Sequence, residues 1–130
     1  MPHFSQTSLK KLATCETELI DLFSHVVKIV DCTVIWGYRD KQQQNDLYER
    51  GFSQRKFPKS KHNVYPAKAI DVAPFPVDWQ NKERFIYFAG IVMGIAKERG
   101  IKLRWGGDWN NDFNPKNEAF FDGAHFELID

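Results

Sequence analysis

The chain has 130 residues, of which 42% are apolar and 15% aromatic, so it is long and apolar enough to bury one hydrophobic core and is not disordered. Eighteen basic and seventeen acidic residues leave a net charge of +1, which argues against nucleic acid as a partner. The two cysteines, Cys15 and Cys32, are too few for a disulfide scaffold, and we expect both to be reduced, half-buried thiols.

The N-terminus has no apolar segment of the kind found in signal peptides, and no stretch of the sequence reaches membrane-spanning length. We therefore expect a protein without membrane insertion that is made and kept in the cytoplasm. If such a protein acts outside the cell, another component must let it out.

The first half of the chain predicts two helices and a strand. Apolar residues at helical spacing predict one helix from Ser8 to about Val30, capped by Ser8 itself or by the preceding threonine. The β-branched and aromatic residues 33–38 predict a strand, and the polar segment 40–49 predicts a short helix ended by the glycine that follows.

The second half begins with a basic, proline-bearing loop over residues 52–66 and a short buried strand over 68–73. A clear amphipathic helix follows at 81–99, and strands are predicted at 101–105 and 124–128. Helices and short strands alternate without a regular βαβ repeat, so we expect the α+β class.

Two of the four histidines have a carboxylate close by in the sequence. His62 precedes Asp71 by nine residues, and His125 follows Asp122 by three. The other two histidines, His3 and His25, lie at the N-terminal end and in the first predicted helix.

Asp71 lies in an apolar strand, where a carboxylate is costly unless it is paired or bound to a cation. Two imidazoles and one carboxylate form a common ligand set for catalytic zinc. His62, Asp71 and His125 are therefore candidate ligands, and Asp122 is a candidate base for a metal-activated water. The alternative is that Asp71 bonds backbone amides and both histidines are packing or surface residues. Residue pattern alone leaves both interpretations open.

Glu127 shares one face of the last predicted strand with His125. It is a competing metal ligand, or a carboxylate that orients a ligand histidine without binding the metal itself. A solvent-exposed polar face would explain Glu127 equally well.

Several short motifs follow one another along the chain: Gly37-Tyr38-Arg39, Ser60-Lys61-His62, Ala69-Ile70-Asp71, Trp105-Gly106-Gly107-Asp108-Trp109 and Asp122-Gly123-Ala124-His125-Phe126-Glu127-Leu128. Motifs in this order resemble those of family M15 of zinc metallopeptidases, which contains D-Ala-D-Ala peptidases and phage L-alanyl-D-glutamate endolysins. The resemblance spans roughly residues 33–128. It implies one peptidase catalytic domain over residues 1–130, of the hedgehog and DD-peptidase type, with an antiparallel sheet and flanking helices.

The same resemblance assigns roles to individual residues. It implies that His62, Asp71 and His125 bind Zn²⁺ and that Asp122 is the general base. It further implies that Arg39 holds a substrate carbonyl or carboxylate, with an ion pair at the surface as the alternative. The implied substrate-binding residues are Ser60, Gln43 and Trp109.

Other residues of these motifs keep two interpretations. Ser60 is either a substrate contact or a capping serine, and Trp105 and Trp109 either line a groove or belong to the core. Asp108 either orients a ligand histidine or stabilises a turn. The basic loop residues either attract an anionic wall peptide or form a solvated surface; they are Arg55, Lys56, Lys59, Lys61 and Lys68.

The spacing from His62 to Asp71 is nine residues, two more than is usual in the family. We expect the extra residues to bulge out around 63–66, which loop closure tolerates at little cost.

The Trp-Gly-Gly-Asp-Trp segment and an aspartate as the base resemble the endolysin branch. The resemblance implies a zinc-dependent, monomeric peptidoglycan endopeptidase that hydrolyses the L-Ala–D-Glu bond of stem peptides. It also implies release from the cytoplasm to the cell wall through a holin. The alternatives are a D-Ala-D-Ala carboxypeptidase or dipeptidase with the same metal centre, and a non-catalytic zinc-containing binding module.

Overall fold

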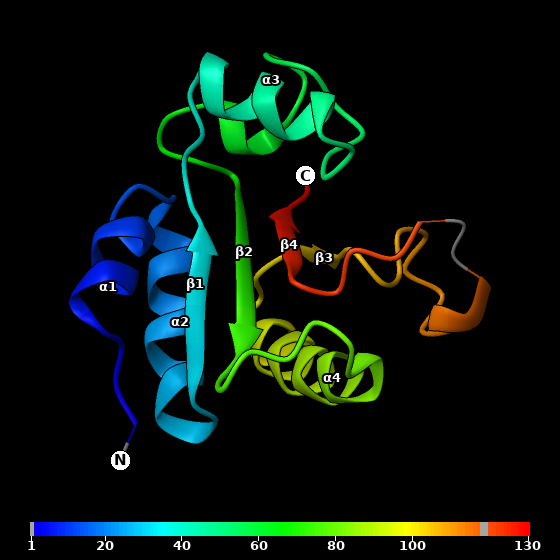
Figure 1. Ribbon diagram of the computed structural model, residues 1–130. Coiled ribbons are helices and arrows are strands. Elements are labelled where there is room, and N and C mark those ends of the chain that lie inside the picture. The colour runs from blue at the N-terminus through cyan, green and yellow to red at the C-terminus, as the bar shows by residue number, and fades with distance from the viewer. Residues whose placement is uncertain (1, 118–119) are drawn as a thin grey trace.

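The computed structural model describes residues 2–117 and 120–130, and their strands form one antiparallel sheet (Figure 1). The strands are β1 (Cys32–Trp36), β2 (Ala69–Pro74), β3 (Leu103–Trp105) and β4 (His125–Leu128), in the spatial order β1-β2-β4-β3. The helices are α1 (Gln6–Leu12), α2 (Thr17–Ile29), α3 (Lys41–Glu49) and α4 (Lys82–Glu98), with 3₁₀ turns η1 (Lys61–Asn63) and η2 (Pro115–Asn117). The predicted α+β class, with an antiparallel sheet and flanking helices, is confirmed.

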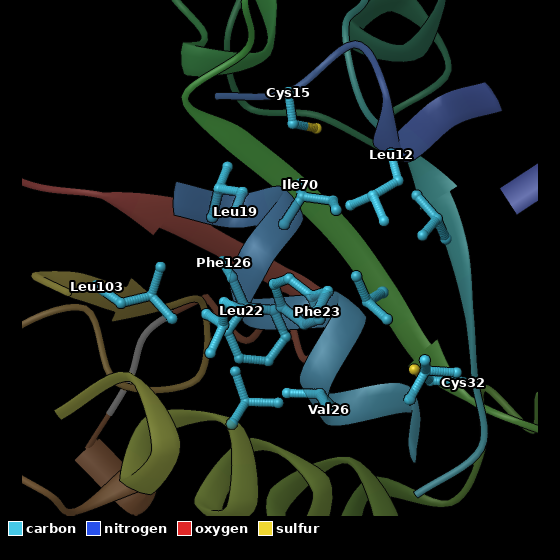
Figure 2. Close-up of a cluster of buried hydrophobic side chains, with 14 of the residues drawn as sticks. Leu12, Cys15, Leu19, Leu22, Phe23, Val26, Cys32, Ile70, Leu103 and Phe126 are labelled. Atoms are coloured by element: carbon cyan, nitrogen blue, oxygen red, sulfur yellow. The ribbon is translucent and has the colours of Figure 1, made fainter. Parts of the chain in front are cut away.

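The core lies between the sheet and helices α2 and α4 (Figure 2). Phe126 on β4 is fully buried, and its ring makes edge contacts with Phe23 of α2 and Phe88 of α4 at 5.5 and 6.2 Å between ring centres. Ile70 of β2 pairs with Phe126 in register and enters the same cluster. Because side chains alternate along a strand, the neighbours of Ile70 and Phe126 face the opposite side of the sheet.

The single helix predicted from Ser8 to Val30 is wrong, because the chain leaves the helix at residues 13–16. There Ala67 donates to the carbonyl of Thr14 and accepts from the amide of Glu16, both at 2.9 Å. The apolar spacing continues through this break, so periodicity alone does not reveal it. Ser5, not Ser8, caps α1, and the buried Ser8 hydroxyl accepts from Val34 of β1 at 3.1 Å.

The remaining predicted elements are present, with shifts of one or two residues at their ends. Asp40 and Asn81 cap the starts of α3 and α4, and glycines with positive φ, Gly51 at 80° and Gly100 at 72°, follow their ends. Within the described residues, no helix is both long and apolar enough to span a membrane.

Cys15 and Cys32 are free thiols but are fully buried rather than half-buried, with 3% of each residue exposed. Burial raises the pKa of Cys15 to about 11 and that of Cys32 to about 12. Both thiols are therefore protonated at neutral pH and behave as small core side chains.

Helix α3 and the segment after it lie over the end of the sheet where β1 finishes and β2 begins (Figure 1). The loop that joins β3 to β4 extends to one side of the same strands (Figure 1). Residues from both segments line one cavity of about 830 Å³, on the face of the sheet opposite the core.

Candidate metal centre and its cavity

Asp71 and His125 lie directly opposite each other on β2 and β4, so their side chains leave the same face of the sheet. The Oδ1 atom of Asp71 is 3.2 Å from Nδ1 of His125. Both side chains are about nine-tenths buried. The apolar neighbours of Asp71 on β2 are explained by this register, because they fill the core face while Asp71 faces the cavity.

His62 comes to the same place from η1. Its Nδ1 atom donates to the carbonyl of Gly37 at 2.7 Å, which leaves Nε2 as the free ring nitrogen. That Nε2 atom is buried and lies 3.3 Å from Oδ1 of Asp71, and it has no hydrogen-bond partner in the part of the chain that the structure describes. A buried acceptor without a donor indicates that the position suits a cation.

The donor atoms of His62, Asp71 and His125 all lie within 4.8 Å of one another. Zinc–ligand bonds of about 2.1 Å in a tetrahedron place neighbouring donor atoms about 3.4 Å apart. The observed separations from the shared Asp71 oxygen, 3.3 and 3.2 Å, match that edge length. The three residues therefore fit a zinc ion in donor type and burial, and in the two separations measured from Asp71.

The pKa values of His125 and Asp71 also indicate that this group of residues suits a positive charge. Burial would lower the pKa of His125, but hydrogen bonds to Asp71 and Glu127 outweigh it and raise the pKa to about 9. Burial likewise opposes ionisation of Asp71, yet the two histidines hold its pKa well below the usual range. The two carboxylates thus hold a positive charge on His125, and a metal ion at Nδ1 would replace that proton.

Glu127 orients His125 from the far side of the ring. Its Oε1 atom lies 2.8 Å from Nε2 of His125, and its Oε2 atom lies 2.6 Å from Arg104 and 3.3 Å from Lys61. Burial would raise the pKa of Glu127, but these bonds lower it to about 2, so it is ionised at neutral pH. Of the interpretations open for Glu127, the contact with the second nitrogen of His125 fits an orienting carboxylate.

Arg39 is buried beside Asp71 and does not lie in a surface ion pair. Its Nη2 atom donates to Oδ2 of Asp71 at 2.7 Å, and its Nη1 atom donates to Oε1 of Gln44 at 3.2 Å. The guanidinium also lies 5.1 Å from the ring centre of Trp36. Arg39 lines the cavity, but its strongest contact is with a metal-binding candidate, so its geometry fits the positioning of Asp71.

Gln43 does not join the group. Its side chain accepts from the amide of Asp40 in a capping box at the exposed start of α3. Sequence reasoning missed Gln44, which is fully buried, accepts from Arg39 and Asn63, and donates to the carbonyl of Arg55 at 2.6 Å. One signal in the sequence was Leu47, an apolar residue three positions after Gln44. Residues three apart lie on the same face of a helix, so Leu47 predicts that Gln44, rather than Gln43, faces the protein interior.

Ser60 is a capping residue at the edge of the cavity. Its hydroxyl accepts from the amide of His62 at 3.1 Å, and Asn63 completes the capping box by accepting from the amide of Ser60. Ser60 also lines the cavity that contains the metal-binding candidates. The two interpretations left open for Ser60 are therefore compatible.

Asp122 lines the cavity three residues before His125 and is partly exposed. Its carbonyl accepts from the amide of His125 at 3.1 Å, and its amide donates to Gly106 at 2.8 Å, so its backbone is fixed. Burial, followed by the negative charge of Asp71, raises the pKa of Asp122 to about 6. A carboxyl group with that pKa can both accept and donate a proton near neutral pH.

The tryptophans of the Trp-Gly-Gly-Asp-Trp segment have different positions. Trp105 is a core residue whose Nε1 donates to the carbonyl of Gly123 at 2.8 Å. Trp109 lines the cavity, with its ring centre 5.3 Å from that of His125. Asp108 accepts from the amides of Asp112 and Phe113, so it stabilises the turn and does not orient a histidine.

A cavity that contains two histidines and an aspartate at zinc-like spacing, with a further aspartate beside them, defines a candidate metal-dependent hydrolase. Comparison with known proteins specifies the class. Residues 1–129 match the sequence model of the family described as phage L-alanyl-D-glutamate peptidase. The chain is 35% identical over 135 residues to the L-alanyl-D-glutamate peptidase of Escherichia phage T5, an alignment that covers 97% of each chain.

The fold is similar to the crystal structure of ChiX, an L-Ala D-Glu endopeptidase of Serratia marcescens. The TM-score is 0.75 at 25% sequence identity, and the alignment covers 98% of this chain and 91% of ChiX. The chain therefore belongs to the family of phage L-alanyl-D-glutamate peptidases.

Proposed function

We propose that residues 1–130 form one catalytic domain, a monomeric zinc-dependent endopeptidase that hydrolyses the L-Ala–D-Glu bond of peptidoglycan stem peptides. Membership of a family whose relatives are named for this activity supports the bond specificity. The single observation that carries the metal dependence is the orphaned Nε2 of His62, 3.3 Å from the Asp71 oxygen that also contacts His125.

His62 through Nε2, Asp71 through Oδ1 and His125 through Nδ1 would hold the ion. When bound, zinc supplies a Lewis acid that makes a water molecule nucleophilic at neutral pH. The hydrogen bond from His62 to Gly37 fixes one imidazole, and the contact of His125 with Glu127 fixes the other. Arg39 keeps the second oxygen of Asp71 occupied, so that Oδ1 is the oxygen turned to both histidines.

Asp122 is the residue that moves protons in this proposal. Its carboxylate accepts a proton from the attacking water and passes it to the amine of the leaving D-glutamyl residue. Without the metal ion its pKa is about 6, so the group is mostly ionised at neutral pH and can accept the proton. Trp109 and Ser60, at the edge of the same cavity, would contact the peptide.

We further propose that the enzyme reaches its substrate by release from the cytoplasm, after a holin has opened the membrane. The phage origin of the T5 relative supports this route.

The test is an amino-group assay on purified cell walls with the zinc-loaded protein. We expect new N-terminal D-Glu to appear. Release of free D-Ala would instead favour a D-Ala-D-Ala peptidase, and zinc retention without either product would favour a binding module. Asp122→Asn should retain zinc and lose cleavage, whereas His62→Ala should lose both, as read by elemental analysis and the same assay.

A further inference from the structure

Among the residues that the structure describes, more positive than negative side chains line the cavity. Five of them are cationic and three are carboxylates. The cations are Arg39, Arg55, Lys59, Lys61 and Arg104, and the carboxylates are Asp71, Asp122 and Glu127. A bound divalent metal ion would add to this excess, so the cavity favours an anionic substrate.

Three of the five cations already have carboxylate partners. Arg39 pairs with Asp71 at 2.7 Å, and both Arg104 and Lys61 pair with Glu127, at 2.6 and 3.3 Å. Within residues 2–117 and 120–130, the side chains of Arg55 and Lys59 have no carboxylate partner. They are therefore the cavity cations that can bind an incoming anion without breaking an existing ion pair.

The other basic residues of the same segment are occupied elsewhere. Lys56 lies 5.2 Å from the ring centre of Tyr48. Arg50 pairs with Asp46 at 3.2 Å and lies 5.0 Å from the ring centre of Phe52. Neither Lys56 nor Arg50 lines the cavity. The excess charge on the cavity side is thus confined to Arg55 and Lys59.

The backbone that carries these two residues is held in place. Gln44, itself fully buried, donates to the carbonyl of Arg55 at 2.6 Å and to the hydroxyl of Ser53 at 2.9 Å. The amide of Lys59 donates to Lys56 at 2.8 Å, and Ser60 then starts the turn that carries His62. Arg55 is thereby tied to the glutamine that also contacts Arg39, and Lys59 lies three residues before a candidate metal ligand.

We propose that Arg55 and Lys59 form a subsite for a free carboxylate on the substrate, next to the scissile bond. The inference rests on the proposed function, because it specifies the substrate of that site. When a D-glutamyl residue is joined to the next residue through its side-chain carboxyl group, its α-carboxylate is free. That carboxylate lies on the same carbon atom as the nitrogen of the scissile bond. The subsite would select this residue over D-isoglutamine, in which an amide replaces the carboxylate and cannot form a charge-assisted bond.

The experiment compares two synthetic peptides, L-Ala–γ-D-Glu–L-Lys and L-Ala–γ-D-isoGln–L-Lys, on the zinc-loaded enzyme. We expect kcat/KM to be at least about ten-fold higher for the D-Glu peptide, as one charge-assisted hydrogen bond provides. Arg55→Gln with Lys59→Gln should lower kcat/KM for the D-Glu peptide by a similar factor and leave the D-isoGln peptide unchanged. Lys97→Gln, an exposed change on α4, is the matched control and should alter neither.

Equal loss on both peptides in the double variant, or no loss on either, would overturn the subsite. Cleavage of neither peptide by the unaltered enzyme would instead contradict the proposed function. In that case calorimetric binding of the two peptides decides the inference separately. Tighter binding of the D-Glu peptide that disappears in the double variant would support it, and equal binding would overturn it.

Discussion

Asp122 should make the metal-free protein less stable at neutral pH, because its ionisation opposes folding. Burial and the charge of Asp71 raise its pKa from 3.8 to about 6, so the folded chain binds this proton more tightly than the unfolded chain does. Below both values the group is neutral in either state and contributes nothing. The free energy of unfolding falls as the pH rises from 3.8 to about 6, and the whole decrease is present at pH 7.

The size of the effect follows from that pKa. A rise from 3.8 to about 6 corresponds to about 3 kcal/mol of unfolding free energy at pH 7. The side chain is partly exposed, so solvent screening reduces the figure, and we expect Asp122→Asn to gain about 1–2 kcal/mol. The same variant should lose peptidase activity, which would make Asp122 a residue that favours function over stability.

Urea unfolding with a metal chelator measures this gain. The midpoint should rise by about 0.5–1 M at pH 7 and by little at pH 4, since the carboxyl is then neutral in the folded chain. Asp21→Asn, at an exposed position on α2, is the control and should leave the midpoint unchanged at both pH values. A variant no more stable than the parent at pH 7, or equally stabilised at both pH values, would refute the reasoning.

Three further variants test the candidate metal centre and the packing of the fold. Glu127→Gln should weaken zinc binding by about ten-fold or more in a competitive titration, because the charge that orients His125 is lost; unchanged affinity would show that Glu127 does not support the centre. Gly37→Ala should destabilise the fold by about 1–3 kcal/mol in urea, because the added methyl group would overlap the backbone oxygen of Lys11. Gly94→Ala, where the methyl group meets open space in α4, should instead stabilise it by about 0.5–1 kcal/mol.

The elements predictable from sequence are those whose signals are local. The caps and glycine stops of α3 and α4, and the alternation of β4, are each encoded within a few residues. The break between α1 and α2 is not, because it depends on a backbone pairing with Ala67, more than fifty residues away. Periodicity in the N-terminal segment continues through the break, so the apolar pattern predicted one helix where tertiary hydrogen bonds produce two.

The candidate metal residues could be predicted because a buried carboxylate and two histidines form a recognisable donor set. Their supporting residues could not, since support depends on contacts between distant segments. The hydrogen bond from His62 goes to the backbone carbonyl of Gly37, and a backbone acceptor cannot be recognised from the type of residue that carries it. The burial of Gln44, which contacts Arg39, depends on which way α3 faces, and the resemblance pointed only to Gln43.

The two extra residues between His62 and Asp71 need not disturb the candidate metal centre, because separate parts of the fold fix these two side chains. His62 is held by Gly37 and by the Ser60 cap before it, whereas Asp71 is held by β2 between its two neighbouring strands. The chain in between, at residues 64–66, is exposed, and Tyr65 packs its ring edge-on against Tyr38 at 5.5 Å. The extra length is therefore taken up at the surface, and the spacing of the donor atoms is determined by the sheet register and the η1 turn rather than by the loop.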